Sequence, residues 1–150
     1  MSDPEVLAVL RQWLRYAGED LRTAEILLEE SDIPRISCFH AQRAAEKSIK
    51  AIFVFLQVDF PFKHNLNRLR DLLPDGWDIK KDFPDLASLS EWAVEPRYPG
   101  DLRKATQEDA EAAVGQARNV YETAVKDLEE HGYEPHDENP QNGSAEEETD

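Results

Sequence analysis

Four basic side chains recur at helical spacing in the segment "CFHAQRAAEKSIKAIFVFL", residues 38–56. Steps of three, four and three residues place them on one face of a helix; they are His40, Arg43, Lys47 and Lys50. Glu46 lies beside this face, four residues before Lys50, in the order that favours an ion pair. Three cations and an imidazole could hold a phosphate group. The same spacing is also typical of a solvated helix face with salt bridges, and spacing alone leaves both interpretations open.

Two further places could contribute to a binding site. In "RYPG", Arg97 could lie on a rigid loop near the basic face with the ring of Tyr98 available for stacking, although a simple tight turn fits as well. His64 precedes a short predicted helix, where a cap or an interhelical hydrogen bond is the alternative to a ligand contact. The chain has no phosphate-binding glycine loop, nucleophile elbow or paired-histidine metal motif. We therefore predict no catalytic residue, no metal ligand and no cofactor.

Charge and composition limit the classes of function. The 150-residue chain has a formal net charge of −15, which argues against passive binding to a polyanion. Seven of the acids lie in residues 131–150, which contain no Lys or Arg, so the rest of the chain could still gather positive charge on one face. The apolar run from Ala51 to Leu56 is too short to span a bilayer, and the N-terminus does not resemble a signal peptide. We expect a cytoplasmic protein without membrane contact.

Hydrophobic residues repeat every three or four positions, and no alternating strand pattern is present. Asp3 before Pro4 is a helix start signal, "TQED" from Thr106 to Asp109 resembles a capping box, and Gly132 is a stop signal. The expected helices are about Pro4–Glu30, Pro34–Gln57, Asn65–Leu73, Pro84–Val94 and Thr106 to Gly132, with a turn at "PDGWD". This pattern predicts an all-α helical bundle over residues 1–132. Residues 133–150 have too few apolar side chains to offset the entropy cost of ordering, and they are expected to form a disordered acidic C-terminal tail.

The second predicted helix is broadly apolar. Phe53 and Phe55 point to different sides of it, so its apolar surface is wider than one packing face requires. Excess apolar surface of this kind is a reason to expect a homodimer.

Three motifs together resemble the HEPN family, the helical domains named from higher eukaryotes and prokaryotes nucleotide-binding. "CFHAQRAAEKSIKAIF" is similar to the family's His-Ala-Gln-Gln-Ala-Ala-Glu-Lys segment, with Arg43 in place of the second Gln. "KHNLNRL" resembles its His-(Asp/Ser)-Leu segment, and "EPRYPG" its Ala-Arg-Tyr-Pro turn. The resemblance covers residues 6–130 and favours the ligand-site interpretation of the basic face.

The resemblance implies that the bundle is an antiparallel four-to-five-helix bundle. It also implies association with a nucleotide or RNA, and a partner that is a small nucleotidyltransferase protein in a toxin–antitoxin-like pair. The expected ligand-binding residues are His40, Arg43, Glu46, Lys47, Lys50, His64, Arg97 and Tyr98. Some branches of the family are ribonucleases with an Arg and a following His that meet across a dimer cleft. That spacing occurs here only at Arg35 and His40, early in the bundle. The leading hypothesis is a non-catalytic nucleotide-binding module, and the alternative is a metal-independent ribonuclease toxin using Arg35 and His40.

Overall fold

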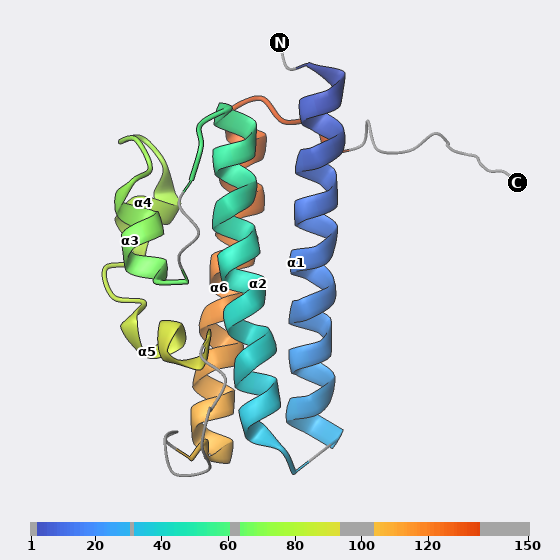
Figure 1. Ribbon diagram of the computed structural model, residues 1–150, viewed down its shortest axis with the longest axis vertical. Helices are drawn as coiled ribbons and strands as arrows, with labels where there is room; N and C mark the ends of the chain where they lie inside the picture. Colours follow the sequence, from blue (N-terminus) through green and yellow to red (C-terminus); the bar gives the residue numbers. More distant parts are fainter. Residues whose placement is uncertain (1–2, 31, 61–63, 94–103, 136–150) are drawn as a thin grey trace, which may run out of the picture.

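The computed structural model describes residues 3–30, 32–60, 64–93 and 104–135. Within these ranges the secondary structure is entirely helical, as predicted. Three long helices, α1 (Pro4–Glu30), α2 (Pro34–Leu56) and α6 (Gln107–Glu130), lie side by side along the long axis of the molecule (Figure 1). The chain reverses between α1 and α2, whereas α6 runs in the same direction as α2 (Figure 1). No helix in the described ranges has both the length and the apolar character needed to cross a membrane.

The ends of the long helices follow the signals in the sequence. The Asp3 side chain accepts a hydrogen bond from the Glu5 N–H at 2.7 Å, which satisfies a free donor at the start of α1. Thr106 and Asp109 form the complete reciprocal capping box at the start of α6. Helix α2 starts with Pro34 and ends at Leu56, and the capping residue Gln57 that follows has a positive φ of 57°, which is unusual for a residue other than glycine.

Short elements pack beside α2 and α6, on the side away from α1 (Figure 1). They are α3 (Leu66–Asp71), α4 (Asp78–Asp82), α5 (Ala87–Ser90) and the 3-10 turn η1 (Glu91–Ala93). The predicted third and fourth helices were thus too long. The predicted turn at "PDGWD" was partly wrong, because α4 begins immediately after the buried Trp77. Leu72, the residue that caps the end of α3, is 53% exposed.

Helix α2 is central to the core because it packs against α1, α6 and the short helices. Phe53 is 1% exposed, and Phe55 lies with its ring centroid 6.1 Å from that of Trp77. Both Phe53 and Phe55 therefore have packing partners within one chain, although Phe55 is only half-buried. The apolar surface of α2 gives no reason of its own to expect a homodimer, and the homodimer stays a prediction.

The core continues beyond the last long helix. Tyr133 is 3% exposed and belongs to the hydrophobic core, and its N–H donates to the Leu128 carbonyl at 2.9 Å. The packed body thus extends one residue past the boundary expected at 132. The rest of the predicted tail, residues 136–150, lies outside the described residues.

Candidate functional site

A cavity of about 460 Å³ lies between α1 and α2. Helix α1 contributes Gln12, Trp13 and Tyr16 to its lining, and residues from α2 and the following loop complete it: Arg43, Glu46, Lys47, Lys50 and His64. The volume is within the range of small-molecule sites. The two helices run antiparallel, so the first half of α1 faces the middle of α2 (Figure 1).

Asp20 of α1 pairs with two basic side chains of α2, His40 and Lys47. Its two carboxylate oxygens contact different partners, Oδ1 with His40 Nδ1 at 2.9 Å and Oδ2 with Lys47 Nζ at 2.6 Å. The Asp20 side chain is only 14% exposed. This ion pair joins α1 to α2, and it offsets the positive charge of Lys47 where that side chain reaches the cavity.

Glu46 is the second acidic residue of this region, and it is buried, with 4% of its surface exposed. Lys50 Nζ donates to its Oε2 at 2.7 Å, and Oε1 accepts from Gln42 Nε2 at 3.0 Å and lies 2.9 Å from His64 Nδ1. Burial acts to raise the pKa of Glu46, but the hydrogen bonds from Lys50, Gln42 and His64 together outweigh it and lower the pKa. Glu46 is therefore a carboxylate at neutral pH. Its charge offsets that of Lys50.

Aromatic rings form the apolar part of the site. The Trp13 and Phe60 rings meet edge to face with centroids 5.9 Å apart, and Lys50 Nζ lies 5.2 Å from the Phe60 centroid. Tyr16 is 42% exposed, and Lys47 Nζ lies 5.8 Å from its ring centroid. Gln12 Nε2 donates to the Tyr16 hydroxyl at 3.1 Å. Tyr16 thus presents a ring next to cationic groups, an arrangement suited to a planar base with an attached anion.

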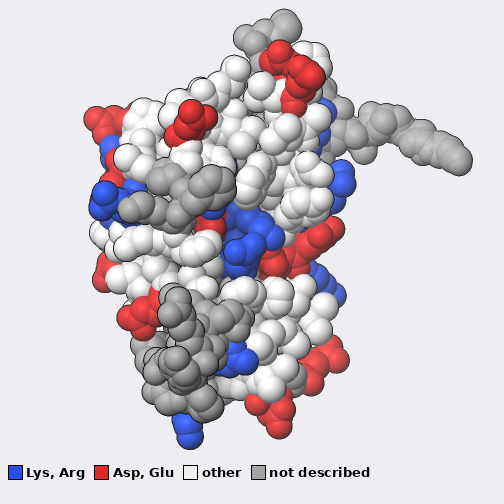
Figure 2. Space-filling model, viewed as in Figure 1, with Lys and Arg blue, Asp and Glu red and all other residues white. Residues whose placement is uncertain are grey.

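Arg43 differs from the two lysines of the cavity. Within the described ranges it has no carboxylate partner; its guanidinium lies 5.9 Å from the Phe39 ring centroid, and it lines the cavity. Figure 2 shows Lys and Arg side chains gathered at the middle of the face over α2, with acidic side chains directly beside them. The site is therefore less cationic than the sequence indicated, because Asp20 and Glu46 lie among the basic residues.

Five of the eight predicted ligand-binding residues lie together around the cavity: Arg43, Glu46, Lys47, Lys50 and His64. His40 is turned to Asp20 and is not part of the lining. Arg97 and Tyr98 lie outside the described residues. Sequence reasoning missed the α1 contribution, namely Gln12, Trp13, Tyr16 and Asp20. Their spacing of about four residues is a weak signal that one polar and aromatic side of α1 faces a partner element.

Arg35 and His40, the residues of the ribonuclease alternative, are both in α2. Five residues of α-helix turn the chain by about 500°, so the two positions lie about 140° apart around the axis. His40 is bonded to Asp20 on the α1 side. One chain therefore does not direct both side chains to the same phosphate, which agrees with the need for a second subunit in that alternative.

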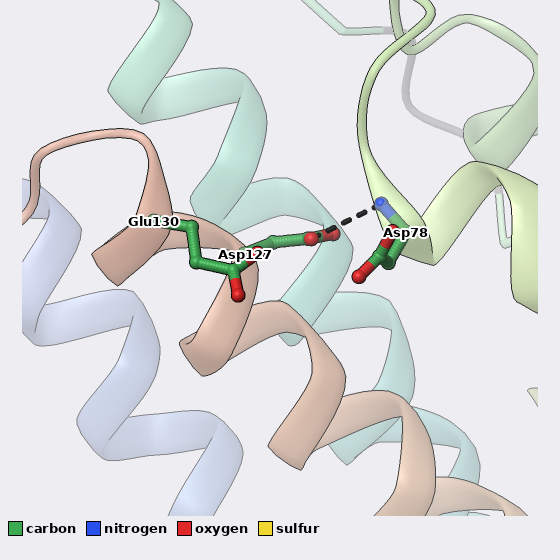
Figure 3. A group of neighbouring side chains, drawn as sticks. All are labelled: Asp78, Asp127 and Glu130. Atoms are coloured by element: carbon green, nitrogen blue, oxygen red, sulfur yellow. Dashed lines mark hydrogen bonds between the residues drawn. The ribbon is translucent and has the colours of Figure 1, made fainter.

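A second acidic group lies at the junction of α4 and α6. Figure 3 shows Asp127 reaching from α6 to the backbone at the start of α4, near Asp78 and Glu130. Its Oδ1 accepts the Asp78 N–H at 3.0 Å and its Oδ2 the Ile79 N–H at 2.8 Å. Both oxygens are thus engaged by free donors of the first turn of α4, which is a capping role supplied from another helix.

The HEPN domain family matches residues 10–128, a segment that holds the three long helices and the cavity. The chain belongs to the HEPN family. This confirms the resemblance found in the sequence, and the observed helical bundle agrees with it. A relative in Methanocaldococcus jannaschii is named "Putative toxin MJ1304"; it is 31% identical over 133 residues, and the match covers 77% of this chain and 85% of the relative.

Two solved structures share the fold. The crystal structure of TT1696 from Thermus thermophilus superposes with a TM-score of 0.68 at 27% identity, over 79% of this chain and 98% of that one. ST0689, described as an archaeal HEPN homologue, gives a TM-score of 0.60 at 22% identity, over 78% and 95% of the two chains. The second likeness concerns the fold alone.

Proposed function

We propose that this HEPN domain binds a nucleotide, without catalysis, in the cavity between α1 and α2. The observation that carries the proposal is the lining of that cavity, in which the Tyr16 ring and the Arg43 guanidinium face the same space. An exposed ring suits base stacking, and a guanidinium binds phosphate oxygens with two parallel hydrogen bonds. The contribution of Arg97 and Tyr98 to ligand binding stays a prediction from the sequence.

The absence of catalysis is part of the proposal. Cleavage of RNA through its own 2′-hydroxyl requires a general base and a group that stabilises charge on the phosphate. The positions of Arg35 and His40 around α2 separate these two roles within one chain. Incubation with labelled RNA, beside an Arg35→Ala/His40→Ala double variant, is expected to show no cleavage. Cleavage that disappears in the double variant would replace the binding proposal with the ribonuclease alternative.

The proposed biological setting is a toxin–antitoxin-like pair with a small nucleotidyltransferase. Its support is the name of the M. jannaschii relative, which the chain matches over most of both lengths. A reading frame for a small nucleotidyltransferase next to this one, and co-purification of the two products, would support the pairing. A homodimer is part of the same proposal, and light scattering that reports only monomer at micromolar concentration would contradict it.

Binding is tested by calorimetric titration of AMP, ADP, ATP and GTP at low salt. Arg43→Met removes the guanidinium and keeps an apolar stem, so affinity is expected to fall at least about tenfold. Arg68→Met is the matched control, because it removes the same charge from the exposed surface of α3. Affinity should also weaken with added salt, as for exposed charge pairs. Equal affinities for the two variants, or no binding of any nucleotide by the unmodified protein, would end the proposal.

A further inference from the structure

The charges around the cavity restrict the kind of nucleotide it can hold. Resting on the proposed function, we infer that the ligand carries a single phosphate group, as a nucleoside monophosphate does, rather than a triphosphate. The inference follows from which cations of the cavity already have a carboxylate partner. It concerns the ligand class of the same site, which the nucleotide-binding proposal by itself leaves open.

Two of the three cations are neutralised inside the protein. Lys47 pairs with Asp20 at 2.6 Å, with side chains 20% and 14% exposed. Lys50 pairs with Glu46 at 2.7 Å, with side chains 8% and 5% exposed. Pairs this well shielded from water keep most of their attraction, so neither lysine is free to follow a ligand without leaving a carboxylate uncompensated.

Arg43 is the remaining cation of the lining. The described part of the chain offers it no carboxylate, and its guanidinium lies instead over the Phe39 ring. Arg43, Lys47 and Lys50 set against Asp20 and Glu46 leave one net positive charge when both histidines are neutral. A guanidinium can satisfy two oxygens of one phosphate group. A ligand with one phosphate group therefore matches the net charge of the cavity.

A triphosphate would meet two carboxylates instead of further cations. Its additional phosphoryl groups would lie next to Asp20 or Glu46, and like charges at short range in a partly dehydrated cavity repel. Glu46 does not relieve this by taking up a proton at neutral pH, because its three partners hold it in the charged form. The second and third phosphates therefore add little or no affinity.

The first test compares AMP, ADP, ATP and inorganic phosphate on the full-length protein at neutral pH and low salt. AMP is expected to bind within about threefold of ATP, and phosphate alone much more weakly because it lacks the stacking base. ATP binding more than about tenfold tighter than AMP would overturn this inference and leave the nucleotide-binding proposal standing. Absence of binding by all four would remove the proposed function itself.

The second test removes the carboxylate that pairs with Lys47, so that a second cation in the cavity can contact the ligand. Asp20→Asn is nearly the same shape, and it releases Lys47 from its ion pair, so ATP affinity should rise about tenfold and AMP affinity less. Asp82→Asn, at the exposed end of α4, makes the same change in net charge far from the cavity and is the control. Melting curves serve to check that both variants fold. An Asp20→Asn protein with the ATP and AMP affinities of the control would show that the carboxylate does not exclude polyphosphates.

Discussion

Glu46 in α2 and Asp127 in α6 are both buried carboxylates, but they have different kinds of partner. Glu46 contacts the side chains of Lys50, Gln42 and His64 at the wall of a cavity. Asp127, at 1% exposure, accepts two backbone N–H groups and joins α4 to α6. The partners of Asp127 are backbone groups of a helix, whereas two of the partners of Glu46, Lys50 and His64, are side chains that line the cavity. The partners therefore distinguish a binding region from a structural one.

The pKa values of these two acids shift in opposite directions. For Asp127, burial is the largest influence and raises the pKa above its ordinary value of 3.8, despite the hydrogen bonds from the Ile79 and Asp78 N–H groups. For Glu46, burial also acts to raise the pKa, but the hydrogen bonds of its side-chain partners win and lower it below 4.5. The side-chain partners of Glu46, which include the Lys50 ammonium, thus outweigh the effect of burial on its pKa, whereas the two backbone amides that bind Asp127 do not.

The largest expected effect is at Glu46. Glu46→Gln keeps the shape but leaves the Lys50 ammonium, only 8% exposed, without its counter-charge, so the free energy of unfolding should fall by about 3 kcal/mol. Chemical denaturation measures this. Glu111→Gln, on the exposed surface of α6, is the control for the change in charge. A loss of unfolding free energy no larger than in the control would mean that the Lys50–Glu46 pair contributes little to stability.

A smaller loss of stability is expected at Asp127. Asp127→Ala leaves the Asp78 and Ile79 N–H groups without an acceptor, which should cost about 2 kcal/mol of unfolding free energy. Nucleotide affinity should not change, since Asp127 is not part of the cavity lining. The measurements are denaturation and calorimetric titration on the same variant. A large change in affinity would contradict the separation of the two regions.

The smallest effects concern pH, and they have opposite signs. Glu46 has a lowered pKa in the folded state. Its contribution to the stability of the fold is therefore complete above pH 4.5 and is lost as the pH falls through the folded-state pKa. Asp127 has a raised pKa, so its charged form costs stability above that pKa, and the cost disappears as the pH falls toward 3.8.

Unfolding free energies between pH 7 and pH 3 test these signs. The difference in unfolding free energy between the unmodified protein and Glu46→Gln should shrink as the pH falls. Over the same range the unmodified protein should gain stability relative to Asp127→Asn. Movement of both differences in the same direction would show that the two carboxylates do not differ as their partners indicate.

Much of the fold could be predicted because its signals are local. The periodicity of α1 and α2 and the capping box of Thr106 and Asp109 depend only on residues within a few positions of each other, and these elements matched within one or two residues. The short helices were predicted less well. Helix α4 has five residues, too few to show a period, and its first turn is capped by Asp127 from 49 positions away.

The candidate site also has features that local sequence predicts and features that depend on how the helices pack. The sequence by itself determined the HEPN resemblance and which α2 residues share a face, because the helix period is a local property. Only the tertiary structure decided that α1 supplies Trp13, Tyr16 and Asp20, and that Lys47 and Lys50 are neutralised while Arg43 is not. The physical reason is that an ion pair between helices depends on the packing angle and register of two segments. Neither quantity is encoded in the spacing within one of them.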